Sequence, residues 1–318
     1  MTLDDVYEPL RRHFGDRVER NAPLGELTTY RVGGHAALRV RAESTNDLII
    51  LGQSIAEGTF EFAVLGRGSN LLVADEGFEG LVITLGDGLS LIEIDGSTVS
   101  AGGGALLPVV ARRTAAAGLT GFEWAVGVPG SIGGAVRMNA GGHGSDMAAS
   151  LVRIEAVDLS TGAVLRRSVD ELGLGFRHSD IARSVVITNV HLQLAPGDRQ
   201  AAEAELSEIV RWRRENQPGG ANAGSVFVNP RPDSAGRLLD DAGVKGMRVG
   251  SAEVSTKHAN FIQVDDSGSA NDVASLMAIV RARVLEVTGV DLHAETHFLG
   301  FSPEIAGAAG ATRVEGSR

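Results

Sequence analysis

The sequence predicts an α+β protein built from three parts, and three observations carry this prediction. The chain has 318 residues, whereas one domain usually takes about 100–200 residues, so that two or three packed domains are expected. Helix and strand patterns alternate near the N-terminus, hairpin signals dominate the middle, and a mixed pattern follows. Glycine is in excess, with 42 residues in clusters, which indicates unusual backbone conformations or close approach to a ligand.

Composition excludes several classes of protein. Hydrophobic residues make up 43% of the chain and charged residues 22%, which is typical of a globular protein rather than a disordered one. No apolar run approaches the roughly 20 residues that span a bilayer, and the acidic N-terminal segment MTLDDVYEPLRRHFG is unlike a signal peptide. Without cysteine, disulfides, thiolate zinc sites and iron–sulfur clusters are excluded. We expect a cytoplasmic protein with no membrane insertion.

The formal net charge of −11 argues against nucleic acid as a partner, because nucleic-acid binding needs a dense basic surface. It leaves room for an anionic small substrate if a few arginines are focused in one place.

The first part, residues 1–85, reads as a small α/β unit. Leu3, Val6, Leu10 and Phe14 share one face of a predicted helix over 3–14. The other elements are a strand near 30–40, a helix over 46–57 capped by Ser44, and a buried strand at 62–65.

The second part, residues 86–198, is rich in strands. Asp95-Gly96 and Thr161-Gly162 are hairpin turns between the predicted strands 89–94 and 98–101, and 151–159 and 163–167. A helix over 106–117 and a strand over 185–194 complete it.

The third part, residues 199–301, mixes the two patterns. Its predicted elements are helices over 200–215 and 271–287 and strands near 247–254, 260–264 and 291–299. The Gly/Ala-rich tail, 302–318, has little to bury and is predicted to be disordered.

The first glycine cluster is Gly66-Arg67-Gly68-Ser69-Asn70-Leu71, directly after a predicted strand. A dinucleotide-binding fingerprint needs glycine at the sixth position, where Leu71 stands, so this is no Rossmann turn. Successive N–H groups of such a loop can form an anion-binding nest. A plain tight turn explains the same residues equally well.

The second cluster places six glycines between Gly127 and Gly142, with Pro129 and Asn139 among them. Interspersed Val, Ile and Met indicate that the segment is buried, which suits backbone pressed against a flat or phosphorylated ligand. The Gly-Lys-Ser/Thr ending of a P-loop is missing.

Together these segments carry a family resemblance. TYRVGG at 29–34, LGRGSNLLVADEGF at 65–78 and EWAVGVPGSIGGAVRMNAGGHG at 123–144 resemble the flavin-binding half of the UDP-N-acetylenolpyruvylglucosamine reductases. NAGSVFVNP at 222–230, RLLDDAGVKGMRVGSAEVSTKHANFI at 237–262 and LHAETHFLGF at 292–301 continue the match in the family order. The resemblance covers roughly residues 20–301.

The resemblance implies a vanillyl-alcohol-oxidase/PCMH-type FAD-binding fold of two α/β subdomains plus a C-terminal α+β substrate-binding domain. FAD would be non-covalent, since no residue of the loops is an obvious tether. NADPH would pass a hydride to flavin N5 and from there to C3 of UDP-N-acetylglucosamine enolpyruvate. The product is UDP-N-acetylmuramate, a peptidoglycan precursor, and we expect a monomer.

The resemblance also implies which residues hold FAD. They are Tyr30, Arg31, Gly33, Gly66, Arg67, Gly68, Ser69, Asn70, Leu71, Val128, Pro129, Gly130, Ser131, Gly133, Gly134, Asn139, Ala140 and Gly141.

Three residues match the family's catalytic positions, namely Arg177, Ser225 and Glu295. Reduction of an enolpyruvyl group builds negative charge on its carboxylate, so a cation and an acid are needed there, and a proton donor at C2. Ser225 is predicted to be that donor. By themselves, Arg177 could be a surface arginine and Ser225 a turn serine.

The run His293-x-Glu295-x-His297 allows another interpretation. In a strand these three side chains would alternate onto one face, where they could bind a metal. We expect no metal, because the family needs none and its catalytic glutamate falls here.

The chain departs from the family pattern at Phe176, where tyrosine is usual, and at Val228, where lysine is frequent. The short spacing of 48 positions between Arg177 and Ser225 resembles the shorter subtype of the family, which lacks a substrate-gripping loop. Substrate contacts, including those to the diphosphate, are therefore assigned to Arg213, Arg214, Asn229, Lys245 and Lys257.

Two other functions stay open at this level. A sugar or alcohol oxidase of the same fold would consume oxygen, and a non-catalytic nucleotide-sugar module would purify without colour.

Overall fold

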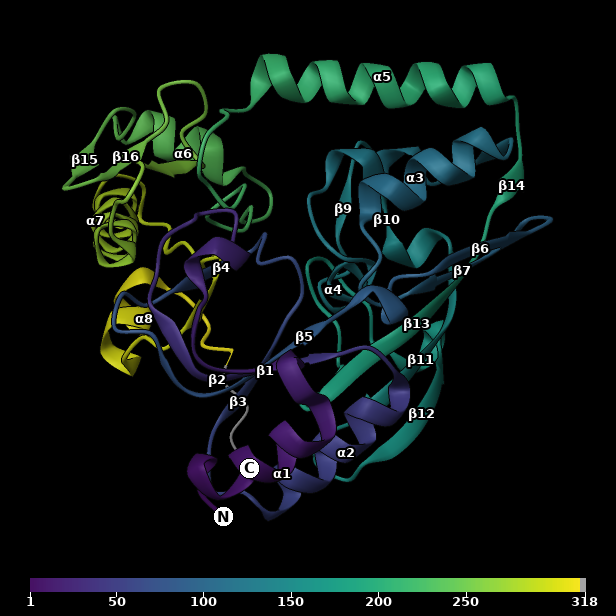
Figure 1. The fold of residues 1–318 in the computed structure, drawn as a ribbon. Helices are drawn as coiled ribbons and strands as arrows, with labels where there is room; N and C mark the ends of the chain where they lie inside the picture. Colours follow the sequence, from purple (N-terminus) through teal and green to yellow (C-terminus); the bar gives the residue numbers. More distant parts are fainter. Residues whose placement is uncertain (315–318) are drawn as a thin grey trace.

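A four-stranded mixed sheet forms the first part of the computed structural model, which describes residues 1–314 (Figure 1). Its strands in sheet order are β1 (Val18–Pro23), β2 (His35–Ala42), β5 (Phe78–Leu85) and β3 (Phe62–Leu65). Strands β1 and β2 are antiparallel, whereas β2 and β3 both run parallel to β5. Short 3-10 helices occupy Gly15–Arg17, Gly25–Leu27 and Asp87–Leu89.

Two helices of this part, α1 (Leu3–Phe14) and α2 (Thr45–Glu57), confirm the predicted spans within one residue. Thr2 and Asp5 cap the N-terminus of α1 with a reciprocal capping box. At the start of α2, the Ser44 hydroxyl accepts a hydrogen bond from the Asp47 N–H. Their apolar faces share one buried core with the first sheet and with Val157 and Val186 of the second sheet.

The second sheet is antiparallel throughout. Its strands in sheet order are β12 (Ala163–Ser168), β11 (Leu151–Asp158), β13 (Val185–Gln193), β7 (Thr98–Gly102) and β6 (Ile92–Asp95). Both predicted hairpins are present, and Gly96 turns the first with φ of +55°.

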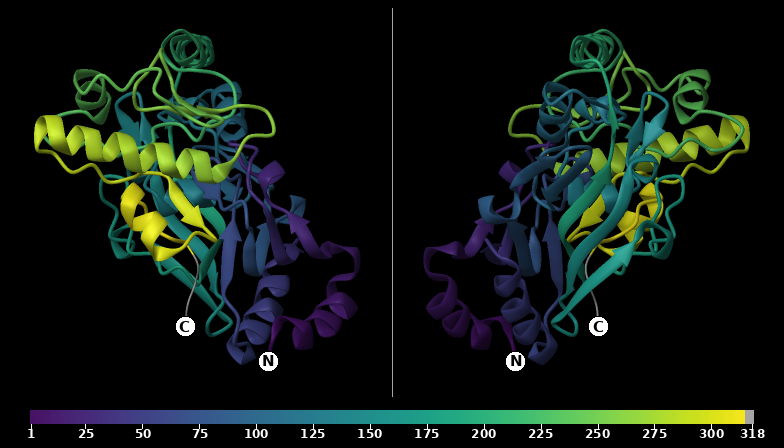
Figure 2. Two further views of the ribbon diagram at one scale, coloured as in Figure 1. Left: turned by 90° about the vertical axis from the view of Figure 1, so that its left-hand side faces the viewer. Right: turned by 90° about the vertical axis from the view of Figure 1, so that its right-hand side faces the viewer.

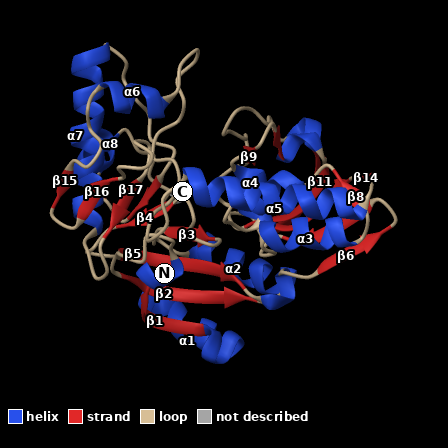
Figure 3. Ribbon diagram, turned by 90° about the horizontal axis from the view of Figure 1, so that it is seen from above, coloured by secondary structure: helices blue, strands red, loops and turns tan. Residues whose placement is uncertain are grey.

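Helices and short strands cover this sheet. They are α3 (Leu107–Ala116), α4 (Ile132–Arg137), β8 (Leu119–Thr120) with β14 (Ala195–Pro196), β9 (Gly141–Gly142) with β10 (Ser145–Asp146), and 3-10 helices at Glu123–Gly127, Met147–Ala149 and Val169–Glu171. Figure 3 shows α3 and α5 (Arg199–Asn216) side by side over the sheet.

Helix α5 was expected at the start of the third part. Its buried residues Ala202, Leu206 and Ile209 instead join the core of the second part, together with Val110 and Trp124. The third part has a separate core, which contains no residue of α5 and to which the chain contributes from Ala223 onward. Helix α5 thus extends from the second part toward the third (Figure 1).

The third part surrounds one long helix. Its elements are α6 (Ala235–Asp241), β15 (Arg248–Val249), β16 (Ala252–Val254), β17 (Ile262–Val264), α7 (Ala270–Thr288), β18 (His297–Leu299) and α8 (Pro303–Ala309). The predicted strand over 247–254 is two short strands, and the one over 291–299 is reduced to three residues.

The prediction that the tail is disordered was wrong for residues 303–309. Residues 303–309 form α8, whose Ala306 and Ala309 are buried against the third part (Figure 2), and Val314 donates its N–H to Phe298. Small residues allow the helix to approach its neighbours closely, so Gly/Ala content is compatible with burial here. Residues 315–318 of the predicted disordered tail lie outside the described residues. No helix within 1–314 has the length and apolar character needed to cross a membrane.

Two contacts fasten the third part to the first. Strand β4 (Leu71–Val73) pairs in parallel with β18, Leu71 opposite His297. The Asp75 carboxylate accepts hydrogen bonds from the Ser269 hydroxyl at 2.5 Å and from the N–H groups of Ala270 and Asn271 at 2.9 and 3.0 Å. A carboxylate at the start of α7 also suits the positive end of the helix dipole.

Replacement Asp75→Asn tests this fastening. An amide cannot accept on both sides, so one donor at the start of α7 loses its partner, and we expect the free energy of unfolding to fall by about 1–3 kcal/mol. Urea unfolding followed by circular dichroism measures it. Asp95→Asn, at the exposed end of β6, is the matched control and should change little. Equal stability of the two variants would contradict the role of Asp75.

Candidate active site

The two glycine clusters lie against each other. A Cβ built on Gly66 would stand 2.7 Å from the Ser131 hydroxyl oxygen, and one on Gly130 would stand 3.2 Å from that of Ser69. In the loop after β3 and in the segment before α4, a glycine therefore faces a serine hydroxyl of the other segment. Larger residues at these glycines would occupy the space between the two loops.

The first loop offers unused donors. Among residues 1–314, none accepts a hydrogen bond from the N–H groups of residues 66–70. Five successive peptide donors without a protein acceptor are the arrangement that binds an anion such as a diphosphate. This observation favours the nest over the plain tight turn.

Gly68 is required for a reason other than ligand space. Its φ is +56°, and a Cβ there would lie 2.4 Å from the carbonyl oxygen of Leu27. Thr29 donates its N–H to the Gly68 carbonyl at 3.2 Å. The loop after β3 is thus pressed onto the segment 27–29, and only glycine permits that approach.

Arg177 and Glu295 form an ion pair, with Nε and Oε1 3.0 Å apart and both side chains about a fifth to a quarter exposed. A second guanidinium nitrogen of Arg177 donates to the Gly141 carbonyl at 2.9 Å. Arg177 has φ of +54°, a conformation that non-glycine residues adopt rarely and often at functional sites. The second glycine cluster therefore ends directly against the arginine.

Glu295 is placed by two bonds that its own backbone makes. Its carbonyl accepts the Asn70 side-chain N–H at 2.9 Å, and its N–H donates to the Val226 carbonyl at 2.7 Å. The first bond ties the glutamate to the loop after β3, and the second ties it to the neighbour of half-buried Ser225. Arg177 and Glu295, far apart in the chain, therefore form a pair, and the backbone of Glu295 bonds to Val226, which follows Ser225.

Asn260 fixes the segment that follows Ser225. Its side chain accepts the Phe227 N–H at 2.9 Å and donates to the Phe227 carbonyl at 2.8 Å, while its own carbonyl accepts the Val226 N–H. This buried asparagine was not singled out from the sequence. Its only signal was a polar residue between the apolar neighbours Ala259 and Phe261.

Burial raises the pKa of Glu295, and the charge and hydrogen bond of Arg177, which act in the opposite direction, only partly offset it. A carboxyl whose pKa is raised takes up a proton more readily, and in its acid form it can donate a hydrogen bond to a nearby anion. Bringing a substrate carboxylate to the same arginine would raise the pKa of Glu295 further, because like charges repel.

The alternation predicted for His293, Glu295 and His297 does not hold. The chain bends at 295–296, where the N–H groups of Glu295 and Thr296 both point to the Val226 carbonyl. His293 is exposed, whereas His297 places Nε2 3.2 Å from the sulfur of Met138. Within 1–314, no group of three or more acidic or histidine side chains is arranged to hold a metal ion.

Two predicted cofactor residues have structural partners. The Tyr30 side chain is fully buried in the core of the third part, which raises its pKa. The Asn139 side chain donates to the Gly175 carbonyl at 2.9 Å and accepts the Ala148 N–H at 3.0 Å. Asn139 thereby holds the loop that carries Arg177.

Four of the five predicted substrate residues have side chains that bond to other residues of the protein. Lys257 donates from Nζ to the Arg214 carbonyl, which links the third part to the end of α5, and Lys245 pairs with Asp240. The Asn229 side chain accepts the Ala235 N–H.

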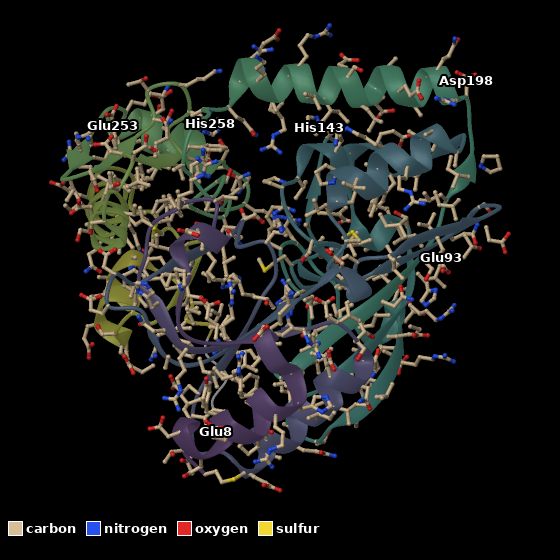
Figure 4. The ribbon with its side chains drawn as sticks, viewed as in Figure 1. Glu8, Glu93, His143, Asp198, Glu253 and His258 are labelled. Atoms are coloured by element: carbon tan, nitrogen blue, oxygen red, sulfur yellow. The ribbon has the colours of Figure 1, made fainter. Side chains whose placement is uncertain are left out.

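The Arg213 side chain donates a hydrogen bond to the Gln217 side chain. His143 lies close enough to feel the charge of Arg213, and its ring packs edge-on against that of Trp212. Figure 4 shows His143 beneath α5 and His258 on the third part.

The fold and the site together define a flavoprotein oxidoreductase with a PCMH-type FAD-binding unit. A family model described as "FAD binding domain" matches residues 36–168. A second, described as "UDP-N-acetylenolpyruvoylglucosamine reductase, C-terminal domain", matches residues 216–299.

Several relatives match over nearly the whole chain. The UDP-N-acetylenolpyruvoylglucosamine reductase of Heliobacterium modesticaldum is 40% identical over 92% of this chain and 94% of its own. Reductase 2 of Symbiobacterium thermophilum is 41% identical over 95% and 99%. The crystal structure of the Thermus caldophilus reductase superposes with a TM-score of 0.78 at 36% identity, covering 89% and 99%. The chain belongs to the UDP-N-acetylenolpyruvoylglucosamine reductase family.

Replacement Gly68→Ala tests the placement of the cofactor loop. The added methyl group must push the loop off residues 27–29 and strains a positive φ, at a cost of about 1–3 kcal/mol, so FAD affinity should fall about tenfold or more. The ratio of flavin to protein absorbance after gel filtration measures retention. Gly96→Ala is the matched control, since φ is +55° there but nothing lies within 4 Å. Full retention in both would count against this loop.

Proposed function

We propose that Arg177, Ser225 and Glu295 carry out reduction of UDP-N-acetylglucosamine enolpyruvate to UDP-N-acetylmuramate, with NADPH as the hydride donor. The chain is an FAD-dependent reductase of its family, whose reaction belongs to peptidoglycan precursor synthesis. The observation that carries the proposal is the Arg177–Glu295 pair set beside Ser225 and against both glycine loops.

The residues present fit FAD, because the unused N–H groups of residues 66–70 suit its diphosphate. When bound, FAD supplies the hydride relay from NADPH to C3 of the enolpyruvyl group. The loops 66–71 and 127–134 are the part of the chain that we assign to holding it. The protein itself must then stabilise the charge that forms on the substrate carboxylate and deliver a proton to C2.

Arg177 suits the carboxylate because its planar fork can bind two oxygens at once. The Gly141 carbonyl and Glu295 hold that fork in place before substrate arrives. Burial raises the pKa of Glu295 and so favours its acid form, which could share a proton with a carboxylate oxygen as charge builds there. The two residues act as one charge-stabilising unit.

Ser225 is assigned the proton for C2. A serine hydroxyl is a weak acid, but it can serve when the intermediate is strongly basic and the hydroxyl lies within hydrogen-bond reach. Asn260 fixes the two residues that follow Ser225, namely Val226 and Phe227, so the hydroxyl is presented next to a rigid segment.

The direct test uses the purified, anaerobically reduced holoenzyme. Adding UDP-N-acetylglucosamine enolpyruvate should restore the oxidised flavin spectrum and yield UDP-N-acetylmuramate. Oxidation of simple sugars or alcohols by the oxidised holoenzyme, with oxygen consumption, would support an oxidase instead, and a colourless protein would support a binding module. A cytoplasmic location and a monomeric state remain predictions from the sequence.

Replacements Glu295→Gln and Arg177→Lys test the charge-stabilising pair. Each should slow flavin reoxidation by substrate by roughly 10²–10³-fold, the usual scale for losing one preorganised contact. In the wild type, reoxidation should also slow as pH rises through the raised pKa of Glu295, because the acid form is lost, and Glu295→Gln should remove that dependence. Stopped-flow absorbance follows the rate. Near-normal rates in either variant would remove that residue from the reaction.

Replacement Ser225→Ala should separate the two half-reactions. Reduction of the flavin by NADPH needs no proton from Ser225 and should stay within a few-fold of the wild-type rate. Overall turnover should fall by roughly 10²-fold or more, the scale for losing a positioned acid. Ser54→Ala, which removes a serine hydroxyl from α2 in the first part, is the control. Equal slowing of both half-reactions would show that Ser225 only supports the fold.

A further inference from the structure

One aromatic ring and one cation beside the reacting residues have no task in the reaction described above. Phe176 precedes Arg177 and is 52% exposed, although it is a large apolar side chain. Arg231 is exposed on the loop that follows Ser225, and its guanidinium carbon lies 5.8 Å from the centre of the Phe176 ring. These two residues come from the second and third parts of the chain.

The Phe176 ring carries two guanidinium groups. Arg177 lies 5.1 Å from the ring centre and Arg231 lies 5.8 Å from it, both within the range of a cation–π contact. The distance between the two guanidinium carbons therefore cannot exceed the sum of these two distances. Arg177 is mostly buried with Glu295, so Arg231 marks the solvent side of the same site.

Arg231 is not committed to a protein partner. No residue in the described part of the chain forms a hydrogen bond or an ion pair with it. Lys245 and Lys257, in contrast, are already bonded to Asp240 and to the Arg214 carbonyl. A guanidinium that rests on a ring keeps its N–H edge free for a planar, bidentate anion.

Charge favours an anion at this point. The chain as a whole carries −11, yet two arginines share one ring at the edge of the site. Focused positive charge of this kind attracts an anionic ligand despite an acidic surface elsewhere. Because the guanidinium carbons lie 5.1 and 5.8 Å from the same ring centre, one extended ligand that carries both a carboxylate and a phosphate could reach both arginines.

We propose that Arg231, resting on Phe176, binds the diphosphate of the nucleotide that enters this site. The inference rests on the proposed function in taking Arg177 and Glu295 as the reacting end of the site. The diphosphate could belong to the uridine nucleotide or to NADPH, since both carry the same group. Phe176 acts by holding the guanidinium in place, which a ring does without the hydroxyl of tyrosine.

Titration calorimetry on the holoenzyme with UDP and, separately, with NADP⁺ tests the proposal. Arg231→Ala should weaken binding of at least one probe by roughly tenfold or more, as expected for a hydrogen bond to a charged group. Arg231→Lys should fall between, because lysine keeps the charge but not the fork. Phe176→Leu should weaken the same probe by a few-fold. Arg12→Ala, which removes an exposed arginine from α1, is the control and should change neither.

The pattern of losses identifies the source of the diphosphate. A loss for UDP, with a raised KM for the enolpyruvyl substrate, assigns Arg231 to the sugar nucleotide. A loss for NADP⁺, with a raised KM for NADPH, assigns it to the dinucleotide. Unchanged affinities for both probes, or a fall in kcat alone, would overturn the proposal.

This outcome can be told apart from failure of the proposed function. If wild-type protein turns over the enolpyruvyl substrate and Arg231→Ala binds both probes normally, the reductase reaction stands and the role of Arg231 falls. If wild-type protein does not turn over the substrate but binds UDP in an Arg231-dependent way, the role of Arg231 stands and the proposed reductase reaction falls. If the wild type binds neither probe, the role of Arg231 is overturned.

Discussion

The parallel pairing of β4 with β18 is the contact on which the site depends. The loop of residues 66–70 runs directly into β4, and Glu295 stands just before β18. Since the strands run in the same direction with Leu71 opposite His297, the two approaches meet at one edge. There the Asn70 side chain donates to the Glu295 carbonyl and His297 donates to the Asn70 carbonyl. The three residue pairs between β4 and β18 thus place Glu295 of the third part next to the loop of residues 66–70 in the first part.

The second glycine cluster completes the site from the other side. Its end, at Asn139 and Gly141, bonds the loop of Arg177 through the Gly175 carbonyl and the guanidinium. Its start faces the first loop at Ser131 and Gly130. One segment therefore contributes to both the expected cofactor space and the position of the charged pair, so a change in its backbone would disturb both.

The sequence predicted much of the fold because its signals were local. Capping residues and apolar periodicity placed α1 and α2, and Asp95-Gly96 and Thr161-Gly162 placed two hairpins. The failures were at the third part, where α5 packs with the second core and Gly/Ala-rich α8 is ordered. Both depend on which surfaces a helix meets, and periodicity gives no information about that choice.

The sequence by itself determined the family, through long motifs, and the resemblance predicted Arg177, Ser225 and Glu295 as the reacting residues. Only the tertiary structure showed that Gly68 is required by the Leu27 carbonyl, that His293 and His297 diverge at a bend, and that Asn260 clamps the segment after Ser225. It also brought Arg231 to Phe176. These contacts join residues distant in the chain. Their distances follow from strand pairing and close packing, which no local pattern of residues encodes.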